Sequence, residues 1–350
     1  MSNPRHAVVL GSTGGVGAQN VEAFAHDPTI RVIALAAAGS NLDLLAFQAV
    51  ELNVYGVALC VGEFNDIDHA LTRANEQGGS NVRPEILIGP NSPIQAASAG
   101  VDIVVNAIAG VSGIGPTLAG LESGAQLWLA NTESSLCPEL LTEASGNHGD
   151  LNERIRLLNP ALNGIQQTLR EHEITKITLT TPTRLAHGGR RRRGQARRIS
   201  ELSGFGAGIA GLELRAITDV EVEVIGHDGP VASVVELRDG RCIFNFHNGP
   251  TQAFPPVGAW EFHTVSQPGL DLALMAGREG KTYPLVLHQT QQQVAEAHLD
   301  GLLGLEAIPT VVAQVLDAHT PPSELTPETL EQTSAWAREH TDKLLKHVDH

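Results

Sequence analysis

The feature that most constrains this chain is a glycine-rich turn directly after its first apolar run. Residues 6–10 read His-Ala-Val-Val-Leu, residues 11–17 read Gly-Ser-Thr-Gly-Gly-Val-Gly, and an amphipathic stretch runs from Val16 to His26. Glycines let a backbone turn tightly and approach a phosphate, and the start of a helix offers free N–H groups and a positive dipole end. The pattern therefore predicts a strand, a turn and a helix that bind a dinucleotide. A tight strand-to-helix turn without a ligand is the alternative interpretation.

The composition narrows the class of protein further. The chain has 350 residues, 42% of them hydrophobic and 4% aromatic, which is enough for two or three domains with aliphatic cores. A formal net charge of −16 argues against binding to nucleic acid or to an anionic membrane surface. Cys60, Cys137 and Cys242 are isolated, which indicates a reducing, cytoplasmic setting. We expect no membrane span, because no apolar run approaches roughly 20 residues. We also expect no signal peptide, because residues 1–5 run directly into the first expected strand.

The first 150 residues alternate short apolar runs with runs of helical period. Continuous apolar strands between helices are typical of a parallel sheet that is covered on both faces. We therefore expect residues 1–150 to form an α/β domain with a Rossmann-like, doubly wound sheet. After the first strand, further strands are expected at 31–36, 55–61, 85–89, 101–108 and 126–129, and a helix at 42–53.

The remainder of the chain has two different patterns. Residues 151–265 combine apolar runs at 155–158, 176–181, 220–225, 232–237 and 241–246 with a helical run at 162–172. The tetrapeptide Arg238-Asp239-Gly240-Arg241 is typical of a hairpin turn. These features predict a central α+β domain with a mixed sheet. Residues 266–350 predict a small helical bundle, with helices at 270–279, 285–299, 306–318 and 326–347.

Several motifs together resemble those of the 1-deoxy-D-xylulose 5-phosphate reductoisomerase (DXP reductoisomerase) family. The matching stretches, in chain order, are Leu10–Gly17, Ala37–Asn41, Val105–Gly110, Leu129–Ser134, Val234–Gly240 and Ala335–Arg338. The resemblance spans nearly the whole chain. It implies an enzyme of isoprenoid precursor synthesis that isomerises and reduces deoxyxylulose phosphate with NADPH and a divalent metal. It also implies a homodimer with three domains in this order.

The segment that corresponds to the family's metal site departs from the pattern. Where the family has Val-Asp-Ser-Glu-His, this chain has Leu158-Asn159-Pro160-Ala161-Leu162, so both carboxylates are replaced. The family's third metal ligand corresponds to Glu213. Because Mg²⁺ and Mn²⁺ prefer anionic oxygen ligands, we expect no bound metal.

The substrate side departs as well. Thr132 and Ala210 stand where the family has lysines, and the lid segment is reduced to residues 187–194 without its tryptophan. This segment carries Arg190, Arg191, Arg192 and Arg193, with Arg197 and Arg198 close behind. One interpretation is an anion clamp for a phosphorylated or carboxylated ligand. The other is a solvated loop whose arginines meet acidic surface. The resemblance implies that Ser203 corresponds to a phosphate-binding serine of the family.

The cofactor and catalytic residues follow from the glycine turn and the resemblance. We expect the cofactor to be bound by Gly11, Ser12, Thr13, Gly14, Gly15, Val16, Gly39, Ser40, Asn41, Asn106, Ala107 and Asn131. Glu133 and Glu213 are the expected catalytic residues. The end of the second strand carries neither an acidic nor a basic residue, so the sequence only slightly favours NADP(H) over NAD(H).

Together these features lead to one main hypothesis and two alternatives. The main hypothesis is a divergent, metal-independent, NAD(P)H-dependent oxidoreductase that acts on a small anionic carbonyl substrate, as a cytoplasmic homodimer without nucleic-acid or membrane partners. The first alternative is a genuine DXP reductoisomerase with an altered site, which forms 2-C-methyl-D-erythritol 4-phosphate. The second is a cofactor-binding pseudoenzyme or a regulatory partner subunit.

Overall fold

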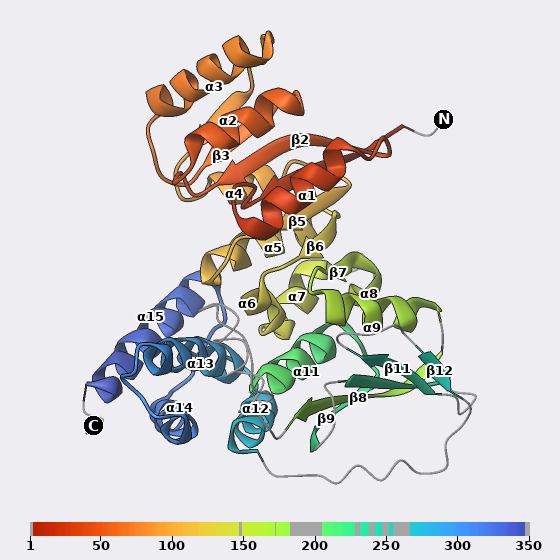
Figure 1. The fold of residues 1–350 in the computed structure, drawn as a ribbon, viewed down its shortest axis with the longest axis vertical. Coiled ribbons are helices and arrows are strands. Elements are labelled where there is room, and N and C mark those ends of the chain that lie inside the picture. The colour runs from red at the N-terminus through yellow and green to blue at the C-terminus, as the bar shows by residue number, and fades with distance from the viewer. Residues whose placement is uncertain are drawn as a thin grey trace. The chain divides into compact units, whose positions relative to one another are not determined.

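A computed structural model describes residues 3–146, 149–171, 173–182, 205–227, 232–237, 242–246, 252–254 and 267–346. The chain forms two compact units (Figure 1). The first comprises Met1–Ser134 and Leu140–Leu158, and the second comprises Ser135–Glu139 and Asn159–His350.

The first unit is built on a parallel sheet of seven strands in the order β4-β3-β2-β1-β5-β6-β7. The strands are β1 (Arg5–Leu10), β2 (Ile30–Ala37), β3 (Gly56–Leu59), β4 (Glu85–Ile88), β5 (Ile103–Asn106), β6 (Gln126–Leu129) and β7 (Ile155–Leu157). The helices between them are α1 (Gly15–Ala25), α2 (Leu42–Glu51), α3 (Phe64–Gly78), α4 (Ser92–Ala97), the 3₁₀ turn η1 (Val111–Gly113), α5 (Ile114–Glu122), α6 (Thr132–Ser135), α7 (Pro138–Ser145) and α8 (Leu151–Arg154).

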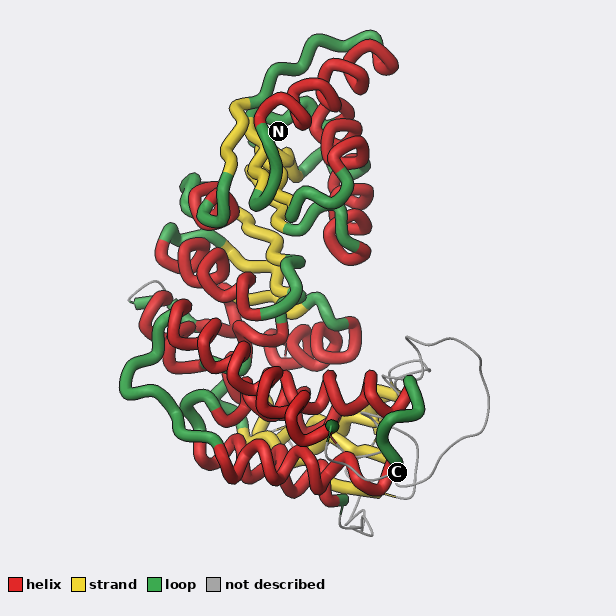
Figure 2. The backbone as a smooth tube through the Cα atoms, turned by 90° about the vertical axis from the view of Figure 1, so that its left-hand side faces the viewer, coloured by secondary structure: helices red, strands yellow, loops and turns green. Residues whose placement is uncertain are grey.

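Alternation along the strands shows that helices cover both faces of this sheet. In β1, Ala7 and Val9 belong to one core cluster with residues of α1, α2 and α3. Val8 and Leu10 are equally buried, and the two-residue period of a strand places them on the opposite face. That face is covered by α5, where a Cβ added to Gly120 would lie 3.5 Å from Val104. Figure 2 shows helices on both sides of the strands, so the expected doubly wound fold is confirmed.

One strand lies in a different sheet from the one expected. The sequence pattern places the run at 155–158 in the central region, but β7 pairs in parallel with β6, with Leu127 opposite Ile155. Arg154, at the end of α8, explains the attachment, because its Nη2 donates to the carbonyl oxygens of Leu121 (2.7 Å) and Ala125 (3.0 Å). The first sheet therefore extends past residue 150.

The second unit contains a mixed sheet of five strands in the order β12-β11-β10-β8-β9. Its strands are β8 (Ile174–Pro182), β9 (Glu221–His227), β10 (Ala232–Leu237), β11 (Cys242–Phe246) and β12 (Gln252–Phe254). Strands β8 and β9 are parallel, and the other pairs are antiparallel, as expected for a mixed sheet. Helices α9 (Pro160–Glu171) and α11 (Phe205–Ile217) belong to this unit, and the expected hairpin turn at 238–241 lies outside the described residues.

The C-terminal part of this unit is helical, as expected. It contains α12 (Pro268–Glu279), α13 (Tyr283–Leu299), the 3₁₀ turn η2 (Leu305–Ala307), α14 (Ile308–Ala318) and α15 (Pro327–Leu345). Prolines occupy the first turns of these four α-helices, where a missing N–H costs no hydrogen bond. Thr326 caps α15, since its Oγ1 accepts from the Thr329 N–H. None of the helices in the described part of the chain is long and apolar enough to cross a membrane.

Candidate cofactor site

The glycine turn joins β1 to α1 at the carboxyl edge of the first sheet. Gly11 has φ +73°, and a Cβ there would lie 2.7 Å from the Ala107 carbonyl oxygen, so both conformation and space require glycine. A Cβ on Gly17 would lie 2.0 Å from the Gly11 carbonyl oxygen, so the helix packs directly against the turn. The outer part of the turn is open to solvent, because Gly14, Gly15 and Val16 are exposed. This is the geometry that a bound pyrophosphate requires.

The turn also lies at the point where the strand order reverses. From β1 the chain winds outward through β2, β3 and β4 and then returns to β5, which pairs with the other side of β1. At this boundary the Ala107 N–H donates to the Leu10 carbonyl oxygen at 3.0 Å. In open parallel sheets, ligands bind outside the carboxyl ends of the strands at such a switch point. The residues predicted in the Gly11–Val16 turn and at 106–107 therefore meet there.

Asn106, the last residue of β5, supports the loop that follows it. Its side chain is fully buried, and Nδ2 donates to the Gly113 carbonyl oxygen (2.8 Å) and to Thr117 Oγ1 (2.7 Å). Oδ1 accepts from the Ile108 N–H at 3.1 Å. The amide therefore binds both ends of the 108–113 loop. The prediction that Asn106 contacts the cofactor stays a prediction, and the structure adds this role in shaping the loop.

Asn131, which follows the neighbouring strand β6, also forms hydrogen bonds to the 108–113 loop. Its Nδ2 lies 2.8 Å from the carbonyl oxygens of Ile108 and Gly110 and 3.1 Å from Glu133 Oε2. Its Oδ1 accepts from the Ser134 N–H at 2.8 Å. Glu133 is only 7% exposed, so this contact holds its carboxylate within the network. Its catalytic role stays a prediction.

The second predicted part of the site is the end of β2. Gly39 has φ +116°, and a Cβ there would lie 2.0 Å from the Val61 carbonyl oxygen. Asn41 caps α2, because its Oδ1 accepts from the Leu44 N–H at 3.2 Å. Ser40, between them, is exposed. It is therefore accessible to a ligand that binds at this strand end.

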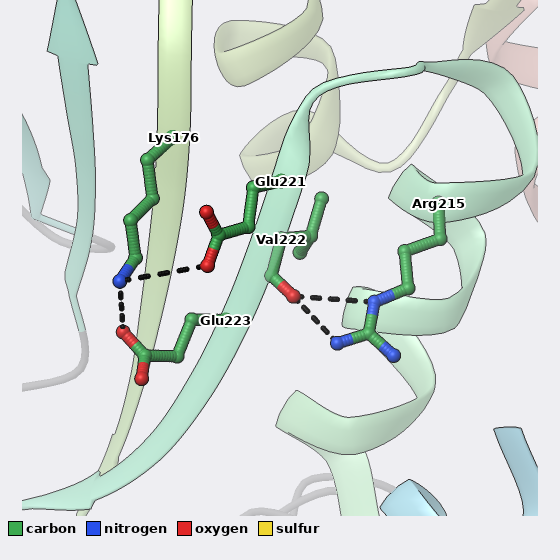
Figure 3. Close-up of polar contacts among 5 residues, drawn as sticks. All are labelled: Lys176, Arg215, Glu221, Val222 and Glu223. Atoms are coloured by element: carbon green, nitrogen blue, oxygen red, sulfur yellow. Dashed lines mark hydrogen bonds and ion pairs between the residues drawn. The ribbon is translucent and has the colours of Figure 1, made fainter. Parts of the chain in front are cut away.

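The structure describes Glu213 within α11, in the second unit. The residue is 7% exposed, and α11 packs closely on its neighbours: a Cβ on Gly211 would lie 2.5 Å from Val224, and one on Gly208 would lie 2.3 Å from the Ala273 Cβ. Arg215, two residues further, donates from Nε (3.2 Å) and Nη2 (2.5 Å) to the Val222 carbonyl oxygen, which ties α11 to β9 (Figure 3). The close packing of α11 and the Arg215 hydrogen bonds therefore fix the backbone around Glu213 against β9.

The face of the second sheet opposite α11 carries a charge cluster. Lys176 Nζ on β8 lies 2.8 Å from Glu223 Oε2 and 3.8 Å from Glu221 Oε1 on β9 (Figure 3). The Glu221 side chain is 70% exposed and that of Glu223 is 45% exposed, so the pairs contribute little to stability.

The remaining predicted residues fall into two groups. The arginines 190–193 and Ser203 lie outside the described residues. Asn159 is described and exposed, at the start of α9. Within the described ranges, no group of three or more His, Cys, Asp or Glu side chains could hold a metal ion.

One residue that shapes the turn lies outside every motif of the sequence. Gln48 lies on the buried side of α2 and donates from Nε2 to the Ser12 carbonyl oxygen at 3.0 Å. A polar residue among Leu45, Ala46 and Ala49 on a buried helix face was the signal that could have revealed it.

Comparisons with known proteins match this arrangement. The family profile described as 1-deoxy-D-xylulose 5-phosphate reductoisomerase matches residues 7–138, and the profile of the DXP reductoisomerase C-terminal domain matches residues 246–340. The chain is 30% identical to the 1-deoxy-D-xylulose 5-phosphate reductoisomerase of Beutenbergia cavernae, in an alignment that is 398 positions long and covers 97% of each chain. It is 29% identical to that of Paenarthrobacter aurescens over 394 residues, again 97% of each chain.

Solved structures share the fold. The Zymomonas mobilis 1-deoxy-D-xylulose 5-phosphate reductoisomerase in complex with NADPH aligns with a TM-score of 0.78 at 22% identity, covering 99% of this chain and 100% of that one. A DOX-P reductoisomerase with fosmidomycin and magnesium aligns with a TM-score of 0.72 at 21% identity, covering 98% of each chain.

These structures correct one expectation. The sequence predicts no bound metal, yet similar proteins of this fold were solved with magnesium, one of them together with NADPH and fosmidomycin. The expectation was wrong because it equated lost carboxylates with lost binding. Mg²⁺ keeps several waters and is commonly held by one or two carboxylates together with substrate oxygens.

Proposed function

Because the chain belongs to the DXP reductoisomerase family, we propose that it catalyses the family's reaction, the NADPH-dependent conversion of 1-deoxy-D-xylulose 5-phosphate to 2-C-methyl-D-erythritol 4-phosphate. The observation that carries the proposal is the open glycine turn at the switch point of the parallel sheet, beside a loop held by two buried asparagines. This takes up the first alternative of the sequence analysis and replaces its main hypothesis of a metal-independent oxidoreductase.

The chain's own residues would bind and orient the cofactor. Gly15 and Val16 are exposed in the first turn of α1, and their N–H groups would hold the pyrophosphate. The 108–113 loop, held by Asn106 and Asn131, lies beside the turn across the β1–β5 boundary and would support the nicotinamide end. NADPH supplies the hydride that reduces the carbonyl carbon, and the protein contributes binding, orientation and exclusion of water.

Cofactor choice follows from the end of β2. Ser40 is exposed there and can donate a hydrogen bond to a 2′-phosphate, and no acidic side chain is present at this strand end to repel that phosphate. A relative of this fold was solved with NADPH. We therefore propose NADPH as the cofactor of this chain.

A divalent metal is part of the proposal, since similar proteins were solved with magnesium. At the positions that resemble the family's metal site, the described residues supply one carboxylate, Glu213, and one amide oxygen, Asn159. Mg²⁺ held by these two residues would complete its coordination with waters and substrate oxygens. A bound metal would polarise the substrate carbonyl.

The finer expectations are retained as part of the proposal. We propose a cytoplasmic homodimer that binds a small phosphorylated substrate. We also propose that the second unit comprises a central α+β domain up to residue 265 and a helical domain from residue 266.

The experiment is a direct assay of the purified chain with deoxyxylulose phosphate, NADPH and Mg²⁺ or Mn²⁺. NADPH oxidation should match formation of methylerythritol phosphate, and a chelator should abolish it. NADPH binding without product at any metal concentration would contradict the proposed reaction, and light scattering of the same sample tests the dimer.

A further inference from the structure

We propose that Gln48 is a positioning residue that presents the backbone of the glycine turn to the cofactor pyrophosphate, an inference that rests on the proposed function. The residue lies on α2, two turns after the Asn41 cap, and it is 4% exposed. Its Nε2 donates to the Ser12 carbonyl oxygen at 3.0 Å, in the middle of the turn. Gln48 therefore links α2 to the turn by a buried hydrogen bond.

The orientation of the turn follows from this bond. A trans peptide is planar, so the Ser12 carbonyl and the Thr13 N–H point in opposite directions in one plane. Because Gln48 holds the carbonyl on the buried side, the Thr13 N–H is directed to the open side of the turn. Within the described residues, this N–H donates to no other backbone group. It is thus available to an anion that approaches the turn.

The start of the turn, at Gly11 and Ser12, is held by the sheet. The N–H groups of Gly11 and Ser12 both donate to the Ala36 carbonyl oxygen, at 2.8 and 3.0 Å. Ser12 is consequently held at its N–H by β2 and at its carbonyl by α2, and its residue is fully buried. Only the following peptide, between Ser12 and Thr13, depends on Gln48 for its orientation.

Burying the Gln48 side-chain amide costs free energy that its packing contacts do not explain. Gln48 Oε1 is buried and has no hydrogen-bond partner in the described part of the chain, and the same is true of Ser12 Oγ. A buried, unsatisfied polar atom is unfavourable, so an apolar side chain of similar length would fill this space more favourably. The single hydrogen bond of the amide goes to the turn. This points to a role in shaping the turn.

The test compares the cofactor affinities of wild type, Gln48→Met and a matched control. Methionine keeps the length of the side chain but cannot donate. The dissociation constant for NADPH, from cofactor fluorescence, should rise about tenfold. The dissociation constant for 2′-AMP, which carries the adenosine end without a pyrophosphate, should stay unchanged.

The control is Asn75→Leu, because Asn75 is another buried amide that binds backbone in the same unit. It donates to the carbonyls of Leu71 (2.9 Å) and Val82 (3.0 Å). It lies near the start of β4, at the amino ends of the parallel strands, whereas the glycine turn lies at their carboxyl ends. It should lower the unfolding temperature and leave NADPH affinity unchanged.

A second variant covers the case in which Gln48→Met does not fold. In Gln48→Glu, an ionised carboxylate cannot donate to the Ser12 carbonyl, whereas a protonated one can. NADPH affinity relative to wild type should therefore be low at neutral pH and recover on acidification.

Equal losses of NADPH and 2′-AMP affinity in Gln48→Met would overturn the inference, as would wild-type NADPH binding. A wild-type protein that binds no nicotinamide cofactor would refute the proposed function and the inference together.

Discussion

Alanine substitutions at Gly14 and Gly17 should separate cofactor binding from folding, because the two glycines meet different neighbours. A Cβ on Gly17 would lie 2.0 Å from the Gly11 carbonyl oxygen and 2.9 Å from the Ser12 Cα. Both neighbours are backbone atoms, which cannot rotate away. Overpacking of this kind costs about 1–3 kcal/mol, and the overlap places Gly17→Ala at the upper end of that range.

Gly14 should behave differently. A Cβ there would lie 3.3 Å from the Gly11 carbonyl oxygen, and the residue is exposed with φ −80°, so alanine requires a shift of only a few tenths of an ångström. We expect a loss of no more than about 1 kcal/mol of stability, the usual effect of alanine at a helix N-cap. The added methyl group would stand where the pyrophosphate must approach. We therefore expect NADPH affinity to fall about tenfold, which corresponds to about 1.4 kcal/mol.

The assay pairs urea denaturation with NADPH fluorescence titration for each variant. Gly15→Ala is the stability control, because its Cβ would meet nothing within 4 Å and alanine is favoured over glycine in a helix by roughly 0.5–1 kcal/mol. If Gly14→Ala bound NADPH as tightly as wild type, the pyrophosphate would not lie on this turn. If Gly17→Ala unfolded at the wild-type urea concentration, the helix-to-turn contact would be refuted.

Three other substitutions test separate features. Arg154→Met removes the donors to the Leu121 and Ala125 carbonyl oxygens. Each buried group left unpaired costs about 1–3 kcal/mol, so the midpoint of urea denaturation should fall clearly. An unchanged midpoint would contradict this role of Arg154. Ser40→Arg adds a cation at the end of β2, so the ratio of NADPH to NADH affinity should rise about tenfold, whereas equal changes in both would place the ribose elsewhere. Burial lowers the pKa of His319, so the unfolded state binds a proton more readily and the free energy of unfolding should decrease as pH falls below the ordinary pKa of 6.5. His319→Gln should show a shallower decrease from pH 7 to pH 5, and parallel slopes would disprove the assignment.

The elements that the sequence predicted well are those whose signals are local. The turn at 11–17 and the helical runs of residues 266–350 depend on residues that lie close together in the chain. The placement of β7 depends instead on pairing with β6, whose partner residue Leu127 lies 28 positions before Ile155. A short apolar run does not specify which sheet it joins, because periodicity carries no information about distant partners.

In the candidate site, too, the sequence identified residues but not the groups to which they bind. The motifs identified Asn106 and Asn131, but they did not reveal that both amides bind the backbone of one loop. Gln48 was missed because it lies outside every motif. The expectation about metal was wrong for a related reason. The lost carboxylates at 159 and 161 were visible, whereas the number of donors that a Mg²⁺ ion needs from the protein was not.

Amides, more than charges, organise the candidate cofactor site. Gln48 holds the glycine turn, and Asn106 and Asn131 hold the loop after β5, each through a hydrogen bond to a backbone carbonyl oxygen. A charged side chain in these positions would carry a large desolvation penalty, whereas an amide can donate and accept at lower cost. Both loops are therefore held in place before any ligand binds, which reduces the ordering cost of binding. Loss of one amide should consequently weaken cofactor binding more than its distance from the cofactor would indicate.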